Sequence, residues 1–241
     1  MIAWPVPPRR EASELLDAPR LPARPLAGNL RDLRRANRYF GGLAVLRRYL
    51  LPVLAAAPRE RPLRLLDVAT GGADLPLALL AWARELGRPL TVVGLDAGVQ
   101  VLAYARQQAG GEPGLRLVRG DAAALPFAPR SFDYALCSLA LHHLAPDAAV
   151  AALREMAGVV RRGLLVVDLE RSWPAYLGTW LWSRACTTNR LSRHDGPLSV
   201  LRAYTPAELR ALAATAGLAA PRVSRGPCFR LVLWAAREPD G

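Results

Sequence analysis

The sequence predicts an α/β fold: one domain built around a mostly parallel β-sheet, with helices on both faces. The chain has 241 residues, of which 52% are hydrophobic and 22% charged, enough to bury one substantial core. After Pro62, short apolar runs alternate with helical segments, as they do in βαβ units. The last two β-like runs are separated by a short connection that contains Gly226-Pro227, and so short a connection allows only an antiparallel hairpin.

The N-terminal part is expected to contain an arm and two helices. Residues 1–28 are rich in proline and arginine and lack periodicity, so we expect an irregular arm. Apolar residues recur at helical spacing from Asn29, and Gly41-Gly42 separates this helix from a second over Leu43–Leu54. We therefore expect a helical cap over residues 29–60, within a single domain over residues 29–241.

The alternating part of the chain gives the sheet its order. Five strands are expected over Leu63–Ala69, Thr91–Leu95, Leu115–Arg119, Phe132–Ser138 and Gly163–Leu169. Helices are expected over Asp74–Leu86, Val99–Gln108 and Pro146–Val160, with one more from Thr205-Pro206 to about Gly217. Residues 170–204 interrupt this order with an aromatic segment and an Arg/His/Asp-rich loop, which we interpret as an insertion. The closing hairpin uses Arg222–Arg225 and Phe229–Ala236.

Charge restricts the classes of partner. The formal net charge is +12, and clustered cations are typical of nucleic-acid binding. However, residues 1–64 hold 13 arginines and 5 acidic residues, so much of the surplus lies in one N-terminal segment. All basic residues are arginines, which indicates a composition bias. A nucleic-acid partner is not favoured, although the basic segment keeps a binding surface open.

Neither a membrane span nor a metal framework is expected. The apolar stretch from Leu43 to Pro58 is interrupted by two arginines and a proline, too soon for a spanning helix. The N-terminus lacks the apolar core of a signal peptide, so we expect a cytoplasmic protein. Cys137, Cys186 and Cys228 are isolated, which predicts neither a disulfide framework nor a zinc site.

A strand-to-helix turn in Leu65–Asp74 is built from small residues that allow a ligand to approach the backbone closely. It lacks the Gly-x-Gly-x-x-Gly fingerprint of dinucleotide sites, so a nucleoside without a pyrophosphate fits better. A turn used for packing alone is the alternative. Asp96 ends the next strand, where a carboxylate accepts both ribose hydroxyl protons or caps the helix that follows.

Asp121 follows a third strand, and its side chain with the N–H of Ala122 offers the acceptor and donor that read an adenine edge. Carboxyl ends of parallel strands meet at one edge of a sheet, where open α/β sheets bind ligands. Asp67, Asp96 and Asp121 are therefore expected to converge on one crevice.

Four ordered motifs carry a family resemblance: Leu65–Asp74, Val93–Asp96, Gly120–Phe127, and Ser131–Tyr134 with Ser138 and Leu141–Leu144. Together they resemble the class I S-adenosylmethionine-dependent methyltransferases related to ubiquinone and menaquinone biosynthesis enzymes, over about residues 29–240. The resemblance implies a Rossmann-like methyltransferase fold, with a seven-stranded, mostly parallel sheet whose last strand is antiparallel. It also implies S-adenosylmethionine as cofactor and S-adenosylhomocysteine as product. We expect no metal, because the sequence shows no cluster of metal ligands.

The resemblance assigns roles to the crevice residues. Asp67 and the turn Ala69, Thr70 and Gly71 are expected at the methionine portion. Asp96 is expected at the ribose, Asp121 and Ala122 at the adenine, and Ser138 beside the transferable methyl group. The family's three-glycine turn reads Ala69, Gly71 and Ala73 in this chain, which puts the backbone geometry at the two alanines in question.

Three histidines are the candidates for a base that removes a proton from the acceptor. His194 lies in the insertion next to Asp195, and we predict it to be the base. His142 and His143 follow the fourth strand near the inferred methyl site. For all three, a purely structural role through hydrogen bonds is the alternative.

The aromatic segment that starts the insertion is expected to hold the acceptor, with Tyr176, Trp180 and Arg193 as contacts. Packing of a helix is the alternative, and the same helix also suits a peripheral membrane contact that delivers a lipophilic acceptor. The leading interpretation is methyl transfer to a small apolar, phenolic, polyketide-like or quinone-like acceptor, with O-methylation favoured. A tRNA, rRNA or protein methyltransferase and a non-catalytic S-adenosylmethionine-binding protein are the alternatives.

Overall fold

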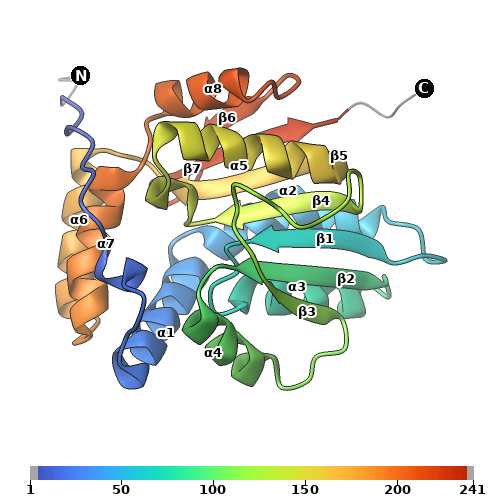
Figure 1. Ribbon diagram of the computed structural model, residues 1–241, viewed down its shortest axis with the longest axis horizontal. Helices are drawn as coiled ribbons and strands as arrows, with labels where there is room; N and C mark the ends of the chain where they lie inside the picture. The colour runs from blue at the N-terminus through green and yellow to red at the C-terminus, as the bar shows by residue number, and fades with distance from the viewer. Residues whose placement is uncertain (1–4, 238–241) are drawn as a thin grey trace.

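A computed structural model describes residues 5–237 and contains a seven-stranded sheet at its centre (Figure 1). The strands are β1 (Leu63–Val68), β2 (Leu90–Asp96), β3 (Leu115–Arg119), β4 (Phe132–Ser138), β5 (Val160–Leu169), β6 (Arg222–Arg225) and β7 (Arg230–Ala236). Their order in the sheet is β3-β2-β1-β4-β5-β7-β6, and only β7 runs against its neighbours. The mostly parallel sheet and the antiparallel last strand are confirmed.

The helices form layers on both faces of the sheet. They are α1 (Ala23–Tyr39), α2 (Gly42–Ala55), α3 (Asp74–Glu85), α4 (Val99–Ala109), α5 (Pro146–Val159), α6 (Trp173–Ala185), α7 (Arg190–Arg202) and α8 (Pro206–Thr215), with the short 3-10 helices η1 (Leu15–Asp17) and η2 (Leu141–His143). Alternate residues of β1 divide the core: Leu66 packs with α5 and α8, whereas Leu65 packs with α2 and α3. This alternation is expected of a strand that is buried on both faces.

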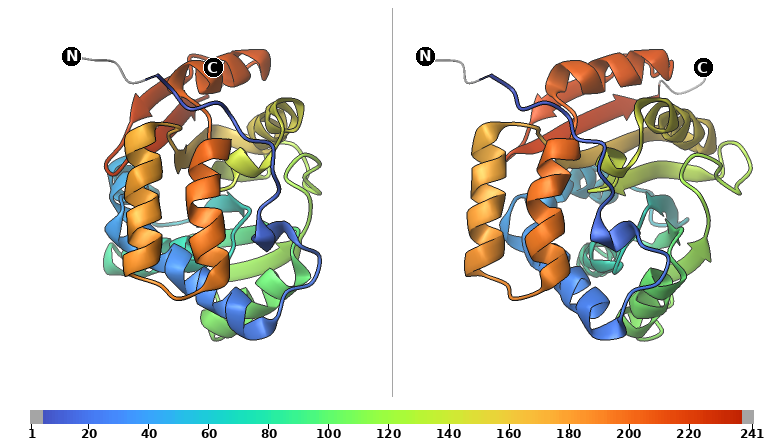
Figure 2. Two further views of the ribbon diagram at one scale, coloured as in Figure 1. Left: turned by 90° about the vertical axis from the view of Figure 1, so that its left-hand side faces the viewer. Right: turned by 60° about the vertical axis from the view of Figure 1, so that its left-hand side comes forward.

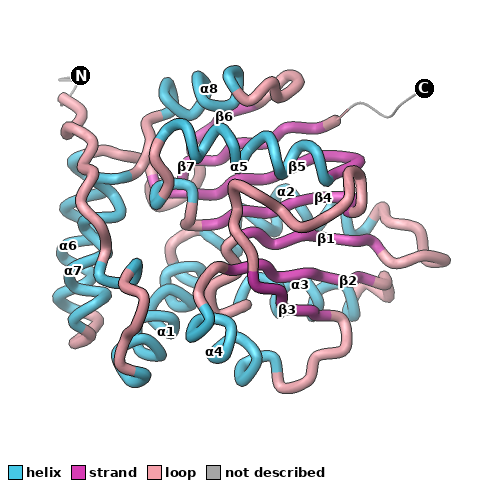
Figure 3. Tube along the Cα trace, in the orientation of Figure 1, coloured by secondary structure: helices cyan, strands magenta, loops and turns pink. Residues whose placement is uncertain are grey.

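Helices α1, α6 and α7 lie beyond the carboxyl ends of the parallel strands (Figure 3). The N-terminal arm passes over α7 and reaches this same edge of the sheet, as the two views in Figure 2 show. No helix within residues 5–237 is long and apolar enough to cross a membrane.

Two expectations about the helices were wrong. The first helix begins at Ala23 rather than near Asn29, because Pro25 lies in its first turn, where proline is tolerated, and Leu26 and Leu30 are buried. The expected Arg/His/Asp-rich loop is helix α7. Its start is capped by Asn189, whose Oδ1 accepts the N–H of Leu191 at 2.8 Å.

Helix α7 also accommodates an internal proline. Pro197 leaves the carbonyl of Arg193 without its usual N–H partner, since proline has none to donate. Arg184 from α6 donates to that carbonyl at 3.5 Å. The two helices of the insertion therefore stabilise each other through polar contacts that sequence periodicity does not reveal.

Candidate active site

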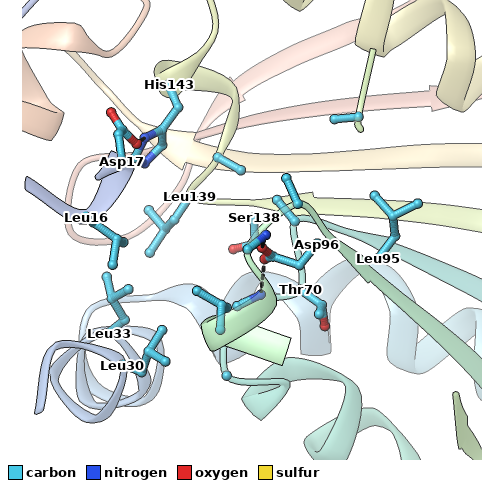
Figure 4. Close-up of a pocket in the computed structure, with 18 of the residues that line it drawn as sticks. Leu16, Asp17, Leu30, Leu33, Thr70, Leu95, Asp96, Ser138, Leu139 and His143 are labelled. Atoms are coloured by element: carbon cyan, nitrogen blue, oxygen red, sulfur yellow. Dashed lines mark hydrogen bonds and ion pairs between the residues drawn. The ribbon is translucent and has the colours of Figure 1, made fainter. Parts of the chain in front are cut away.

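A cavity of about 560 Å³ lies at the carboxyl edge of the sheet, beyond the ends of β1, β2, β3 and β4 (Figure 4). It brings together all of the expected crevice residues: Asp67, Ala69, Thr70, Gly71, Asp96, Asp121, Ala122 and Ser138. Leu16, Asp17 and Leu21 of the N-terminal arm line it from the other side, together with Leu30 and Leu33 of α1. The arm was not expected to take part in this site.

The turn after β1 adopts the backbone geometry that the three-glycine pattern implies. Ala69, Gly71 and Ala73 all have positive φ, at 56°, 55° and 60°. Two alanines therefore occupy the left-handed region that glycine enters at lower cost. A Cβ built at Gly71 would meet no atom within 4 Å, so this turn leaves its backbone open to a ligand.

Two carboxylates stand at the strand ends: Asp67 is buried and Asp96 is half-buried. Burial raises the pKa of Asp67 to about 7, and the nearby Asp74 and Asp96 add to the increase. Burial also raises the pKa of Asp96, although backbone N–H groups oppose the shift. Asp96 Oδ2 accepts the N–H of Gly71 at 3.0 Å and Oδ1 accepts the N–H of Gly98 at 2.8 Å. Each oxygen keeps a lone pair for one ribose hydroxyl.

The third and fourth strand ends complete the cavity. Asp121 Oδ1 accepts the N–H of Ala123 at 2.9 Å, which fixes the carboxylate beside Ala122. Ser138 at the end of β4 has a buried hydroxyl with no hydrogen-bond partner. Leu139, the next residue, has a φ of 52°, an unusual conformation for leucine. Buried unsatisfied groups and backbone strain are typical of binding sites.

A second cavity, of about 350 Å³, adjoins the first. Four residues line both: Leu16, Leu33, Leu139 and His143. In Figure 4 Leu16 and Leu33 lie opposite Leu139, with His143 beyond Leu139 and Asp96 and Ser138 on the other side. The junction between the two cavities is thus apolar except for one imidazole.

A polar cluster supports that imidazole; within it Glu14, His142 and Asp168 are buried, and Asp17 is exposed. His143 Nδ1 lies 2.8 Å from Asp17 Oδ1, and His142 Nδ1 lies 2.6 Å from Asp168 Oδ1. Glu14, on the arm, lies between the two rings, 3.6 Å from the Nε2 atom of each. Hydrogen bonding at Nδ1 orients each ring and leaves Nε2 directed toward Glu14.

Two acids of the cluster have shifted pKa values in opposite directions. Burial raises the pKa of Glu14 to about 7, although His143 opposes the shift. Asp17 is affected most by its burial, which raises its pKa, but the hydrogen bond and positive charge of His143 together lower it to about 2. Glu14, His142 and His143 also offer three ligand atoms within 4.8 Å of one another, so this cluster is the candidate metal position within residues 5–237.

The structure does not bring His194 to either cavity. Its side chain is 50% exposed on α7, and Nδ1 lies 2.8 Å from Asp195 Oδ1. Asp195 in turn accepts the N–H groups of Leu15 and Leu16, which fastens η1 to α7. The His194-Asp195 pair therefore fits the alternative that it holds the insertion in place.

The expected acceptor contacts also lie outside these two cavities, although Arg193 lines a separate one between α1 and the connection from α6 to α7. Tyr176 packs edge-on against Trp173, and Trp180 is 38% exposed with Arg184 over its ring. Arg193 donates to the carbonyls of Thr187 and Arg184, at 2.8 and 3.3 Å, at the end of α6. All three side chains contact neighbouring residues of the chain, and none of them lines either of the two cavities described above.

Other residues line the second cavity and were missed. Trp182 faces it from α6, with its ring edge-on to that of Phe40, the residue after α1, at 5.5 Å between ring centroids. Gly178 and Thr179 lie four and three residues before Trp182, so all three share one face of α6. This i, i+3 and i, i+4 spacing was the available signal in the sequence. Glu14 and Arg230 also line the cavity, but no local pattern marks either one.

Comparisons with known proteins agree with this architecture. Residues 65–163 match a family model described as a methyltransferase domain. A demethylmenaquinone methyltransferase from Staphylococcus epidermidis is 35% identical over 122 residues, which are 51% of this chain and 48% of the relative. One from Bacillus licheniformis is 37% identical over 113 residues, 47% of each chain. The chain therefore matches about half the length of these curated relatives.

Solved structures share the fold at low sequence identity. A SAM-dependent methyltransferase from Aquifex aeolicus gives a TM-score of 0.63 at 15% identity, over 87% of this chain and 97% of that one. Human N-acetylserotonin methyltransferase, in complex with SAM, gives 0.61 at 18% identity, over 91% of this chain and 57% of that one. At these identities the likeness concerns the fold alone.

Proposed function

We propose that this chain is a class I S-adenosylmethionine-dependent methyltransferase and that it methylates an oxygen of a small apolar, phenolic, polyketide-like or quinone-like acceptor. Its methyltransferase-domain match and its fold support the first part of this proposal. The observation that carries the proposal is the junction of two cavities at His143. One cavity is lined by the strand-end carboxylates and the other is mostly apolar. The names of the curated relatives, demethylmenaquinone methyltransferases, support a small-molecule acceptor.

The residues of the first cavity fit S-adenosylmethionine. Asp96 offers free lone pairs to the ribose, and Asp121 with Ala122 is placed to bind the adenine. The open turn at Gly71 and the unpartnered hydroxyl of Ser138 remain for the methionine portion. When bound, S-adenosylmethionine supplies an electrophilic methyl group on a sulfonium. The protein's contribution is to align that group with the acceptor and to exclude water.

His143 is the best placed base for the acceptor proton. It lines both cavities, and Asp17 holds its Nδ1, so Nε2 is available to accept a proton. The ion pair with Asp17 stabilises the imidazolium that forms as the proton arrives. Glu14, beside both histidine Nε2 atoms, is placed to receive the proton afterwards. Leu16, Leu33 and Leu139 surround the junction and keep water away from it.

We also propose that the reaction needs no metal ion. A sulfonium methyl group is already electrophilic, and His143 with Asp17 accounts for the acceptor proton. Dialysis against EDTA should leave turnover unchanged. Loss of activity that returns with a divalent cation would instead assign a metal to Glu14, His142 and His143.

A peripheral membrane contact is proposed for α6, which presents Leu177, Trp180 and Leu181 at 50%, 38% and 60% exposure. The opposite side of this helix lines the second cavity with Trp182, so a lipophilic acceptor would need to travel only across one helix. Flotation with phosphatidylglycerol vesicles should recover the wild type and lose the Leu181→Ser variant. Equal recovery of both, or of neither, would contradict the contact.

The direct test uses S-adenosylmethionine labelled in its methyl group. Incubation with separated small-molecule, RNA and protein fractions should place the label in the organic extract of the small-molecule fraction. Label in RNA or protein would support the alternative acceptor classes, and donor binding without transfer would indicate a non-catalytic protein.

Asp96→Ala should weaken S-adenosylhomocysteine binding about tenfold or more in calorimetry, since a hydrogen bond to a charged group contributes about 1.5–3 kcal/mol. Unchanged affinity would remove Asp96 from the ribose.

A further inference from the structure

Arg230, the first residue of β7, is a buried cation at the wall of the second cavity. The residue is 1% exposed. Its Nε donates to the carbonyl of Phe40 at 2.9 Å and its Nη2 donates to that of Ala36 at 3.5 Å, both at the end of α1. Its Nη1 is buried and has no hydrogen-bond partner. Burial lowers the pKa of Arg230 to about 10, so it stays charged at neutral pH.

A buried charge without a full set of partners is costly, so the unused nitrogen calls for an explanation. Capping of α1 accounts for Nε and Nη2. It does not account for Nη1, which is the remaining corner of a planar fork that suits a carboxylate or another oxyanion.

The acidic groups of the same cavity are already engaged elsewhere. Asp195 accepts the N–H groups of Leu15 and Leu16, and Glu14 accepts the hydroxyl of Ser199 at 2.8 Å. Asp32 accepts the hydroxyl of Ser192 at 2.7 Å. These carboxylates are held by other parts of the chain. Asp168 and Asp74 lie near enough to stabilise the Arg230 cation, but no group of the described chain is hydrogen-bonded to its Nη1.

Asn29 provides a second unpartnered group in this cavity, of the opposite kind. It is 3% exposed, and its Nδ2 donates to Ser192 Oγ at 3.3 Å. Because the Ser192 hydroxyl donates to Asp32, it can only accept from Asn29, and this fixes the orientation of the amide. Asn29 Oδ1 has no partner, so it is free to accept a ligand hydroxyl.

We infer that the second cavity takes a hydroxylated acid: an acceptor with an oxyanion, such as a carboxylate or an ionised enol, that binds Arg230 Nη1, and a hydroxyl that donates to Asn29. This inference rests on the proposed function and specifies its substrate class. Arg230 is thus a specificity-determining residue as well as a cap for α1.

The test measures binding of a matched pair of probes to the protein saturated with S-adenosylhomocysteine. Benzoate and benzamide have almost the same shape, and only benzoate carries a charge. The wild type should bind benzoate at least tenfold more tightly in calorimetry, since a charge-assisted hydrogen bond contributes about 1.5–3 kcal/mol. Arg230→Gln should reduce this ratio at least fivefold and leave the affinity for S-adenosylhomocysteine unchanged.

Arg225→Gln is the matched control, because Arg225 is a 70% exposed arginine of β6 that pairs with Glu170. It should keep the wild-type ratio, which separates a local contact from the protein's overall positive charge. If Arg230→Gln does not fold, Arg230→Lys keeps the charge without the fork and should reduce the ratio by a smaller factor. A wild-type ratio below tenfold, or an Arg230→Gln variant that keeps the ratio, would overturn the inference. This experiment measures binding and not methyl transfer. A failure of the proposed function would therefore be detected separately, in the methyl-transfer assay.

Discussion

Ala69 occupies a left-handed backbone conformation, with a φ of 56°, in the turn that lines the first cavity, the proposed donor cavity. This conformation destabilises the folded state by roughly 1–2 kcal/mol for an L-residue, and glycine removes that strain. About half of the benefit is lost, because glycine also has greater conformational freedom in the unfolded chain. We therefore expect Ala69→Gly to raise the free energy of unfolding by about 0.5–1 kcal/mol. Ala78→Gly, inside α3, should lower it by about 1 kcal/mol. Urea unfolding of the ligand-free variants gives both values, and a loss in both would argue against strain at Ala69.

Two tryptophans of α6 offer a comparison of acceptor contacts. Trp182 lines the second cavity, whereas Trp180 lies on the outer side of the helix. Trp182→Leu should raise the KM for the acceptor about fivefold or more, because apolar area buried against the acceptor is lost. Trp180→Leu should leave the KM unchanged, and the affinity for the donor should be unchanged in both variants. An equal rise in KM for both would mean that the cavity is not the acceptor site.

At the scale of elements, the arm is fastened to the fold by a carboxyl that titrates near neutrality. Burial raises the pKa of Glu14 from 4.5 to about 7. The folded state therefore binds this proton more tightly than the unfolded chain does. The protonated carboxyl makes its whole contribution to the free energy of unfolding below about pH 4.5, and this contribution is lost as the pH rises through 7. Glu14→Gln keeps the acceptor for Ser199 and has no proton to lose. The free energy of unfolding of the variant minus that of the wild type should therefore increase by about 2 kcal/mol between pH 5 and pH 8.

Denaturant titrations of the two proteins at both pH values test this directly. The comparison between them cancels the other titrating groups, Asp67 included, which also has a pKa raised to about 7 by burial. A difference that is independent of pH would mean that Glu14 is ionised throughout this range.

The arm also forms part of the donor cavity, through Leu16, Asp17 and Leu21. Saturating S-adenosylhomocysteine should therefore hold the arm in place and slow tryptic cleavage at Arg20 at least fivefold. Cleavage at the exposed Arg59, between α2 and β1, should be unaffected and serves as the internal control. Equal protection at both sites would indicate a global effect, and protection at neither would separate the arm from the donor site.

At the scale of the whole molecule, the sequence was most informative where the signals are local. Strand ends that carry Asp67, Asp96 and Asp121 are marked by apolar runs, and parallel topology alone brings them together. The antiparallel hairpin follows from the short connection over residues 226–229, which contains Gly226-Pro227. These features gave the sheet, its antiparallel last strand and the donor cavity.

The acceptor side depends on contacts between distant segments, and local patterns do not report them. His194 next to Asp195 suggested a catalytic pair, but Asp195 binds the backbone of Leu15 and Leu16, about 180 residues away. Glu14 lies in a segment without periodicity, and its place between His142 and His143 exists only once the arm has docked. The cluster that we propose to be catalytic is therefore assembled from three separate parts of the chain: the arm, η2 and β5.

The central claim is that a methyl group passes between the two cavities beside His143, and a matched pair of histidines tests it most directly. His143 and His194 each have Nδ1 at 2.8 Å from an aspartate, but only His143 lines the cavities. With labelled S-adenosylmethionine at neutral pH, His143→Gln should lower kcat by about 10²–10⁴-fold while the affinity for S-adenosylhomocysteine is retained. His194→Gln should retain the wild-type kcat. A wild-type kcat in His143→Gln, or a comparable loss in His194→Gln, would contradict the account.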